Sequence, residues 1–164
     1  NTENIGLTKS LNKLINYSSG SYIARQDADD ISELSRIEKQ INFLYSNNLD
    51  ACCTRAYVKE TKKIIPGISF YFPLKMIIKI KNPFIHGTLL IKKSILNKLG
   101  NYNERFIYSQ DYKLMKDLLV NNYKVKTIND TLYHLNMKDN ISSNFKTEQK
   151  YYADCVRKNI DPID

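Results

Sequence analysis

The first part of the chain switches between helical and strand-like hydrophobic spacing. Apolar residues recur at helical intervals in residues 7–15 and again in residues 31–48, and the first pattern stops at Gly20. Residues 21–25 and 49–58 have the composition and spacing of strands. This order predicts an α/β domain whose parallel strands are joined by right-handed crossovers. The apolar residues that give the two helical patterns are Leu7, Leu11, Leu14 and Ile15 in the first and Leu34, Ile37, Ile41 and Leu44 in the second.

The middle of the chain, residues 59–82, is irregular. It contains Pro66, Gly67 and Pro73 and mixes the two spacings, so it predicts either a flexible loop over a site or a short helix with a turn. Regular patterns return after it. They predict a strand at 84–91, a short helix at 93–100, a helix at 109–122 with Ser109 as its N-cap and Leu114, Leu118 and Leu119 facing inward, and a strand at 123–128.

Three carboxylates, Asp27, Asp29 and Asp30, end the stretch SYIARQDADD, just after a predicted strand. Ligands of parallel α/β sheets bind beyond the carboxyl ends of the strands. Asp27 and Asp29 are alternate residues, which point to the same side of an extended chain. Oxygen ligands of this kind suit Mg²⁺ or Mn²⁺, which commonly bridge to a diphosphate. The alternative is a turn in which Asp30 caps the next helix and forms a capping box with Glu33.

Composition narrows the class of protein without choosing a function. The 164 residues suffice for one domain with a core, and no apolar run reaches the roughly 18 residues that a bilayer crossing needs. The first residues lack a signal-peptide pattern and an initial Met, so we expect the sequence to begin inside a longer protein. The net charge of +8 favours anions such as nucleic acid, acidic lipid headgroups or phosphorylated small molecules, unless it reflects only a Lys-rich composition.

The cysteines predict structural thiols. Cys52, Cys53 and Cys155 have neither Cys-x-x-Cys nor Cys/His metal spacing, and the adjacent pair lies in a predicted strand. Their usage is typical of a reducing compartment, which predicts the cytoplasm.

Two blocks of motifs occur in order along most of residues 1–132. The first contains Asn-x-Gly at 4–6, Asn12, Gly-x-Tyr at 20–22, Asp-x-Asp-Asp at 27–30 and Arg-Ile-Glu-Lys-Gln at 36–40. The second contains His-Gly at 86–87, Gly-x-Tyr-x-Glu-x-Phe at 100–106 and Asp-Tyr at 111–112. Together they resemble the family 2 glycosyltransferases, enzymes of the GT-A fold that use nucleotide-sugar donors.

The resemblance implies a role for each matching acid. Asp27 matches the acid that approaches the nucleotide ribose and the metal region. Asp29 matches the acid that holds Mn²⁺ or Mg²⁺ on the donor diphosphate. Asp111 matches the general base that takes the proton of the acceptor hydroxyl. Because Asp111 falls in the first turn of a predicted helix, the helix dipole would keep it ionised; the alternative is an Asp that is present only for that dipole.

Other matching positions surround the donor. His86 and Gly87 match the family's strand beside the donor and acceptor sugars, where a Gly lets a ligand approach the backbone. Arg25 precedes the acidic motif and could contact a phosphate; the alternative is an Arg that is exposed at a sheet edge. The family often places a His or Arg near the leaving diphosphate. Alignment on the Asn-Ile-Ser-Ser stretch puts Met137 at that position, with His134 nearby.

The resemblance also implies the architecture. We expect an α/β fold of the GT-A type, a Rossmann-like, mostly parallel sheet flanked by helices, without its first βα elements. Residues 1–164 would form one partial catalytic domain. Its parts would be the metal-motif segment 1–58, the flexible loop region 59–82, the acceptor-side segment 83–135 and the tail 136–164. We expect this chain alone to be inactive, or nearly so, and to expose a hydrophobic sheet edge that favours self-association.

The predicted function is that of an inverting hexosyltransferase. It would move a sugar from a nucleotide-sugar, most simply a UDP-sugar, to a saccharide or lipid-linked acceptor in bacterial surface polysaccharide or lipooligosaccharide synthesis. Its basic surface suits contact with an anionic membrane, and no nucleic-acid partner is expected. Two alternatives stay open. One is a nuclease or phosphotransferase in which Asp27, Asp29 and Asp111 hold two metals. The other is a non-catalytic module that binds acidic polymer or membrane.

Overall fold

A computed structural model describes residues 3–138 and 145–163, and the structural statements that follow concern these residues. Here six strands form one sheet in the order β1-β5-β3-β6-β2, and β4 pairs with the end of β3. The pair β3 and β6 is parallel, and the other described pairs are antiparallel. The strands are β1 (Tyr22–Ala24), β2 (Ile31–Ser32), β3 (Ala51–Val58), β4 (Lys63–Ile65), β5 (Leu90–Lys92) and β6 (Val125–Leu135).

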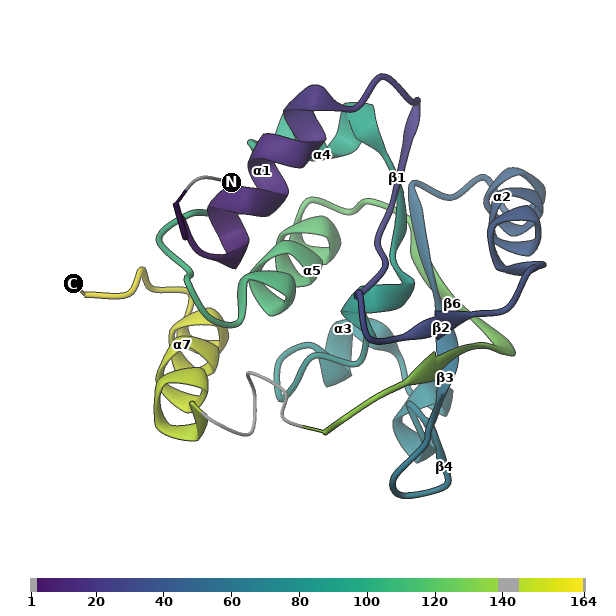
Figure 1. Ribbon diagram of the computed structural model, residues 1–164. Helices are drawn as coiled ribbons and strands as arrows, with labels where there is room; N and C mark the ends of the chain where they lie inside the picture. The colour runs from purple at the N-terminus through teal and green to yellow at the C-terminus, as the bar shows by residue number, and fades with distance from the viewer. Residues whose placement is uncertain (1–2, 139–144, 164) are drawn as a thin grey trace.

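Helices cover both faces of this sheet (Figure 1). α1, α4, α5 and α7 lie on one side, and α2 lies on the other. Short helical turns, η1, α3 and η2, occupy the connection between β4 and β5. The helices are α1 (Leu7–Tyr17), α2 (Arg36–Ser46), η1 (Ile68–Tyr71), α3 (Leu74–Ile77), η2 (His86–Thr88), α4 (Lys93–Leu99), α5 (Gln110–Val120) and α7 (Lys146–Lys158).

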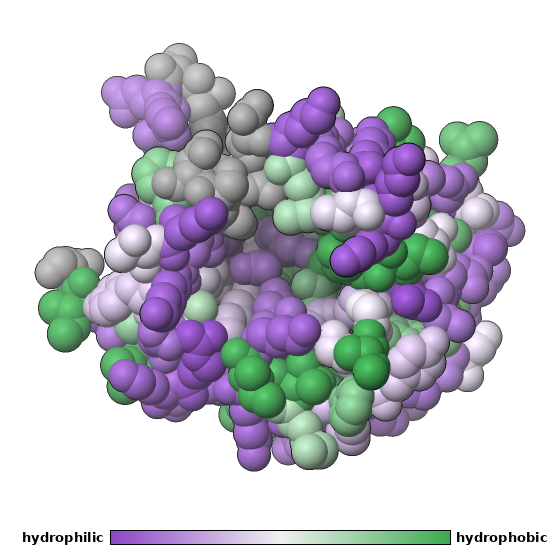
Figure 2. All heavy atoms as spheres, turned by 90° about the horizontal axis from the view of Figure 1, so that it is seen from below, coloured by the Kyte–Doolittle hydropathy of each residue, from purple (hydrophilic) through white to green (hydrophobic). Residues whose placement is uncertain are grey.

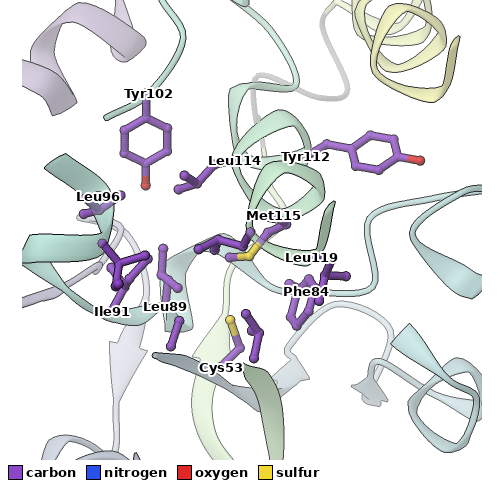
Figure 3. Packing of buried hydrophobic residues seen from close by; sticks show 14 of the residues in the cluster. Cys53, Phe84, Leu89, Ile91, Leu96, Tyr102, Tyr112, Leu114, Met115 and Leu119 are labelled. Carbon is purple, nitrogen blue, oxygen red and sulfur yellow. The ribbon is translucent and has the colours of Figure 1, made fainter. Parts of the chain in front are cut away.

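The central strand β3 carries the core on both faces. Ala51 and Cys53 point into the larger cluster, which includes Met115 of α5 (Figure 3), whereas Cys52 points toward Leu44 of α2. Successive side chains of a strand alternate between faces, which explains this division. The three cysteines are free and buried, as the sequence predicts, and burial raises the pKa of Cys52 to about 12. They are therefore structural thiols.

The helix predicted at 31–48 begins later than its pattern indicates. Ile31 and Ser32 form β2 and pair with His134 and Tyr133 of β6, and α2 starts only at Arg36. Leu34 is consequently fully exposed instead of facing the core. The proposed capping box is also wrong, because the carboxylate of Asp30 accepts a hydrogen bond from the Asn136 amide at 2.7 Å. Long-range pairing with β6 overrides the local helical pattern here.

The prediction of parallel strands is wrong for most of the sheet. β5 lies between β1 and β3 and is antiparallel to both, because it returns along the sheet after the η1–α3 connection. The strand predicted at 84–91 is also shorter than expected. Its first part forms the turn η2, and the strand begins at Leu90. The last strand, by contrast, extends beyond its prediction to Leu135.

The predicted helix with a turn is present within residues 59–82. β4 forms a hairpin with β3, and η1 and α3 follow it. The terminal strand β1 pairs with β5 and is the outer strand on its side of the sheet. An apolar groove beside it is lined by Leu11, Leu14 and Leu89. Within the described residues, no helix has both the length and the apolar composition for a membrane crossing.

Candidate functional site

One cavity of about 890 Å³ brings all the predicted site residues together. It lies between the ends of β1 and β6 on one side and the start of α5 on the other. Figure 2 shows a hollow with hydrophilic residues near the centre of one face. The predicted residues that line the cavity are Arg25, Asp27, Asp29, His86, Gly87 and Asp111.

Asp27 and Asp29 differ in their surroundings. The Asp27 carboxylate accepts a hydrogen bond from the Arg25 guanidinium, which also donates to the Gln26 carbonyl. Asp29 is exposed at the cavity. The two alternate carboxylates therefore face the same space, as predicted, but a neighbouring guanidinium compensates the charge of one of them. The Arg25 side chain therefore lies in the cavity next to these acids.

Tyr133 of β6 holds residues 27–30, which we call the acidic loop, in place. This fully buried residue accepts a hydrogen bond from the Asp27 amide at 3.0 Å and is hydrogen-bonded to the Asp30 carboxylate. Burial raises the pKa of Asp30, although the hydrogen bonds from Asn136 and Tyr133 oppose this effect. Asp30 therefore ties the loop to β6, while Asp27 and Asp29 remain available to the cavity.

Gly87 makes room for these groups. A Cβ atom added at this position would lie 2.5 Å from the Tyr133 hydroxyl and 2.9 Å from the Asp27 Oδ2 atom. Side chains do not tolerate such distances. The sequence predicts that Gly87 lies in a strand and lets a ligand approach its backbone, and the structure requires a different explanation for this glycine. Gly87 lies in the turn η2, and what it admits in this structure is the Tyr133 hydroxyl and the Asp27 carboxylate.

His86 is the first residue of the same turn and lines the cavity. Its Nε2 atom is 2.7 Å from the Tyr102 hydroxyl, with which it shares a hydrogen bond. Burial lowers the pKa of His86, although the nearby Asp111 carboxylate opposes this effect. The imidazole is therefore neutral at pH 7 and offers a polar, uncharged group to the cavity.

Arg36 and Gln40 of α2 join the acidic loop to the turn η2. Both are buried and, four positions apart, lie on the same face of the helix. Arg36 donates to the Gly87 and Arg25 carbonyl oxygens, each at 3.1 Å, and its guanidinium lies 5.3 Å from the centre of the Tyr133 ring. Gln40 donates to the Thr88 carbonyl at 2.8 Å. The Arg-Ile-Glu-Lys-Gln motif thus positions the site without lining it.

Asp111 stands in the first turn of α5 on the opposite wall. Its Oδ2 atom accepts a hydrogen bond from the Asn82 amide at 2.8 Å, and Asn82 also accepts one from the Phe84 backbone. The prediction that the Ser109 side chain caps this helix is wrong. Ser109 precedes the helix, but its hydroxyl donates to Gln149 of α7, so no side chain caps the helix. The positive end of the helix dipole still lies next to the Asp111 carboxylate.

The chemistry of the donor set fits Mn²⁺ or Mg²⁺ in part. Among the described residues, no group of three or more His, Cys, Asp or Glu side chains gathers where it could hold a metal. A Mg²⁺ ion, however, usually keeps several waters and uses one or two carboxylates together with substrate phosphates. Asp27 and Asp29 supply two such carboxylates on one cavity wall. They suit an ion that arrives with a diphosphate better than a resident ion held by protein alone.

Several positioning residues escape prediction from the sequence. Tyr133 lies beyond the strand predicted at 123–128, and Gln40 belongs to the quoted motif at 36–40, whose task the sequence does not indicate. Asn82 precedes Pro83, and the Asn-Pro pair marks a turn that could have drawn attention to it. Met137 lines the cavity, whereas His134 pairs with Glu33 at 2.6 Å and does not. The Asn-Ile-Ser-Ser stretch behind that alignment lies outside the described residues.

Two relatives match most of this chain and are longer than it. The chain is 32% identical over 159 residues to an uncharacterized glycosyltransferase of Methanocaldococcus jannaschii, covering 92% of this chain and 54% of the relative. It is 30% identical over 149 residues to the O-antigen biosynthesis glycosyltransferase WbnJ of Escherichia coli, covering 89% of this chain and 58% of the relative. The chain therefore spans about half the length of these relatives.

Solved structures share the fold. The crystal structure of TarS from S. aureus in complex with UDP-GlcNAc superposes with a TM-score of 0.69 at 15% identity, covering 85% of this chain and 41% of that one. The mannosyltransferase of Pyrobaculum calidifontis, in complex with GDP-Man and Mn²⁺, gives a TM-score of 0.66 at 16% identity, covering 98% and 46%. The mixed sheet with helices on both faces is thus an α/β fold of the GT-A type.

The family itself follows from the sequence match. Residues 1–116, well over half of the chain, match the family described as Glycosyl transferase family 2. This match includes the acidic loop, the η2 turn and the start of α5, three of the segments that line the cavity. The chain belongs to the family 2 glycosyltransferases.

Proposed function

We propose that this chain is the metal-binding and acceptor-binding part of a hexosyltransferase that uses a nucleotide-sugar donor. The observation that carries the proposal is the meeting of Asp27, Asp29 and Asp111, from segments more than 80 residues apart, in one cavity. The solved relatives that bind UDP-GlcNAc and GDP-Man support a nucleotide-sugar as the donor class. A UDP-sugar is the donor to test first.

The acidic loop would receive the donor diphosphate. Asp27 and Asp29 would hold Mn²⁺ or Mg²⁺, which supplies Lewis-acid stabilisation of the charge on the leaving nucleoside diphosphate. Arg25 reaches the same region and can bind a phosphate oxygen through a charge-assisted hydrogen bond. Its present partner, Asp27, would be released to the ion when the phosphate takes the guanidinium.

Asp111 would act as the general base on the opposite wall. An acceptor hydroxyl oxygen attacks the anomeric carbon while its proton passes to an Asp111 carboxylate oxygen. The bond between that carbon and the diphosphate oxygen breaks, and its electron pair leaves with the nucleoside diphosphate. Attack from the face opposite the leaving group inverts the anomeric centre. The Asn82 amide occupies one Asp111 oxygen and so directs the other toward the acceptor.

The acceptor belongs to cell-surface carbohydrate synthesis in this proposal. The relative WbnJ is an O-antigen biosynthesis enzyme, which supports a saccharide or lipid-linked saccharide as the acceptor class in bacterial polysaccharide synthesis. Because the chain spans about half of its relatives, we propose that complete transfer needs additional residues that bind the nucleotide base. Measurable sugar transfer by purified Asn1–Asp164 would refute that part.

Calorimetry with UDP and several UDP-sugars tests the donor site. An extended version of the protein, as long as the relatives that it matches, should bind them only when Mn²⁺ is present. Asp29→Ala should abolish the Mn²⁺-dependent part of binding. Asp130→Ala provides the matched control, since Asp130 is an exposed acid of β6 outside the cavity and pairs with Lys39. The absence of nucleotide-sugar binding in the extended protein, with or without metal, would contradict the proposal.

A further inference from the structure

The segment of residues 59–81 exposes an unusual number of large apolar side chains. Ile68 is 80% exposed, Tyr71 73% and Ile80 66%. Single exposed apolar residues are common, but a series from one short segment marks an interaction surface. We name this segment the basic apolar strip. Its exposed large apolar residues are Ile64, Ile68, Tyr71, Phe72, Met76 and Ile80.

The same strip is strongly basic. It contains six lysines and one acid, Glu60. All of the lysines are exposed, and they lie in the first and last parts of the strip, on either side of Ile68, Tyr71 and Phe72. The lysines are Lys59, Lys62, Lys63, Lys75, Lys79 and Lys81. Neither property alone selects a partner, but together they describe a surface with both apolar and cationic groups.

The exposure is built into the fold, because contacts with the body of the molecule hold the strip. The Arg55 guanidinium of β3 lies 5.2 Å from the centre of the Phe70 ring. The Tyr112 hydroxyl of α5 donates to the Ile78 carbonyl at 2.7 Å. Ser69 and Ile78 are buried, so the backbone is anchored at these points while the neighbouring apolar side chains remain outside.

The strip leads directly to the cavity. Its last residue, Lys81, precedes Asn82, the residue that donates to the Asp111 carboxylate. β4, at the start of the strip, projects at the lower edge of the molecule in Figure 1. Figure 2 views that side and shows apolar groups beside hydrophilic ones around the central hollow. A partner bound to the strip would therefore lie next to the acceptor side of the site.

We propose that the basic apolar strip docks on an anionic lipid bilayer. Tyr, Phe, Ile and Met side chains can enter the boundary between headgroups and acyl chains, while lysines around them contact lipid phosphates. A protein partner fits less well, because lysine is depleted in the cores of protein interfaces. Nucleic acid fits less well too, because it offers no apolar phase for the exposed isoleucines and Met76. The docking is independent of the transfer chemistry, whereas delivery of a lipid-linked acceptor to Asp111 rests on the proposed function.

The chain contains no tryptophan, which allows a clean fluorescence test. Tyr71→Trp places a single reporter in the strip. Tyr17→Trp places one at the last residue of α1, where Tyr17 is 77% exposed; α1 lies in the upper part of Figure 1, away from β4. Vesicles of phosphatidylcholine containing phosphatidylglycerol should shift the emission of the Tyr71→Trp protein to the blue. They should leave the Tyr17→Trp protein unchanged, and phosphatidylcholine alone should shift neither.

Charge reversal then separates docking from general attraction. Lys63→Glu/Lys79→Glu, made in the Tyr71→Trp background, should weaken vesicle binding at least about tenfold. Lys13→Glu/Lys98→Glu changes the net charge equally through exposed lysines of α1 and α4 and should leave binding within about twofold. Equal loss in both pairs, equal shifts of both reporters, or a shift with single-stranded nucleic acid but not with vesicles would overturn the proposal. Donor binding is measured without lipid, so its outcome tests the proposed function independently of membrane docking.

Discussion

The two walls of the cavity hold their carboxylates in different ways. The acidic loop with Asp27 and Asp29 is fixed by buried groups from distant segments: the Tyr133 hydroxyl, the Arg36 guanidinium and the space left by Gly87. Asp111 stands on the first turn of a long helix and has a single described side-chain partner, Asn82. A loop needs external support to keep its shape, whereas a helix supplies its own. Substitutions should therefore affect chemistry alone at Asp111, but both stability and binding around the loop.

The largest effect is expected when the Asp111 carboxylate is removed. Asp111→Asn keeps the shape of the side chain and its place at the helix N-terminus but cannot accept the acceptor proton. General-base catalysis typically contributes about 10²–10⁴-fold, so sugar transfer by the extended protein should fall by about that factor. Thermal unfolding and calorimetric donor binding should stay near the wild-type values. Wild-type transfer rates in Asp111→Asn would show that this acid serves the helix dipole only.

Gly87→Ala should damage the other wall in a different way. The added Cβ would meet the Tyr133 hydroxyl at 2.5 Å and Asp27 Oδ2 at 2.9 Å, so one of them must move. Overpacking of this kind costs typically about 1–3 kcal/mol, and we expect that loss in urea unfolding together with weaker donor binding. Gly67→Ala is the control, because the nearest atom to its added Cβ lies at 4.0 Å. Unchanged stability and donor binding in Gly87→Ala would contradict the proposed packing.

The same contrast explains how much of the site could be predicted from the sequence. Asp27, Asp29 and Asp111 occupy positions at which local sequence rules predict functional residues. The first two follow a strand, and Asp111 lies at the start of a helix. Tyr133 and Arg36 support them from positions where a polar residue carries no local signal. Asp27 and Tyr133 are 106 residues apart, and single-sequence spacing contains no information on such pairing. Resemblance to the family found the Arg36–Gln40 motif but not its task.

The fold could be predicted in part for a similar reason. The helices at Leu7–Tyr17 and Lys93–Leu99 follow from local apolar spacing and a stop signal at glycine. β2 has only two residues, and it exists because Ile31 and Ser32 pair with β6 a hundred positions later. The direction of β5 depends likewise on its neighbours in the sheet and not on its own residues. Local patterns therefore find elements, whereas strand direction and register come from distant contacts.

Tyr133→Phe separates the support of the loop from its shape. The ring and its contact with Arg36 remain, but the Asp27 amide loses its acceptor and the Asp30 carboxylate loses a partner. Leaving buried polar groups without partners costs about 1–3 kcal/mol, which urea unfolding should detect, and Mn²⁺-dependent donor binding should weaken. Tyr112→Phe removes a buried hydroxyl that donates to Ile78, away from the loop. It should cost stability but leave donor binding unchanged; equal binding in both variants would contradict the role given to Tyr133.

The smallest expected effect is a pH dependence that comes from Asp30, the buried carboxylate of the acidic loop. Burial raises its pKa in the folded protein, so between that value and its unfolded value of about 3.9 the folded state binds more protons than the unfolded state. Ionised Asp30 therefore disfavours folding near neutral pH, and the penalty disappears as the pH falls through this window. Asp30→Asn does not titrate. From about pH 7 to about pH 4, wild-type stability in urea unfolding should rise relative to Asp30→Asn. A relative fall would mean that the hydrogen bonds from Asn136 and Tyr133 outweigh burial. Asp30 would then hold the loop most firmly as an anion, and the acidic loop would owe its position to charge as well as to packing.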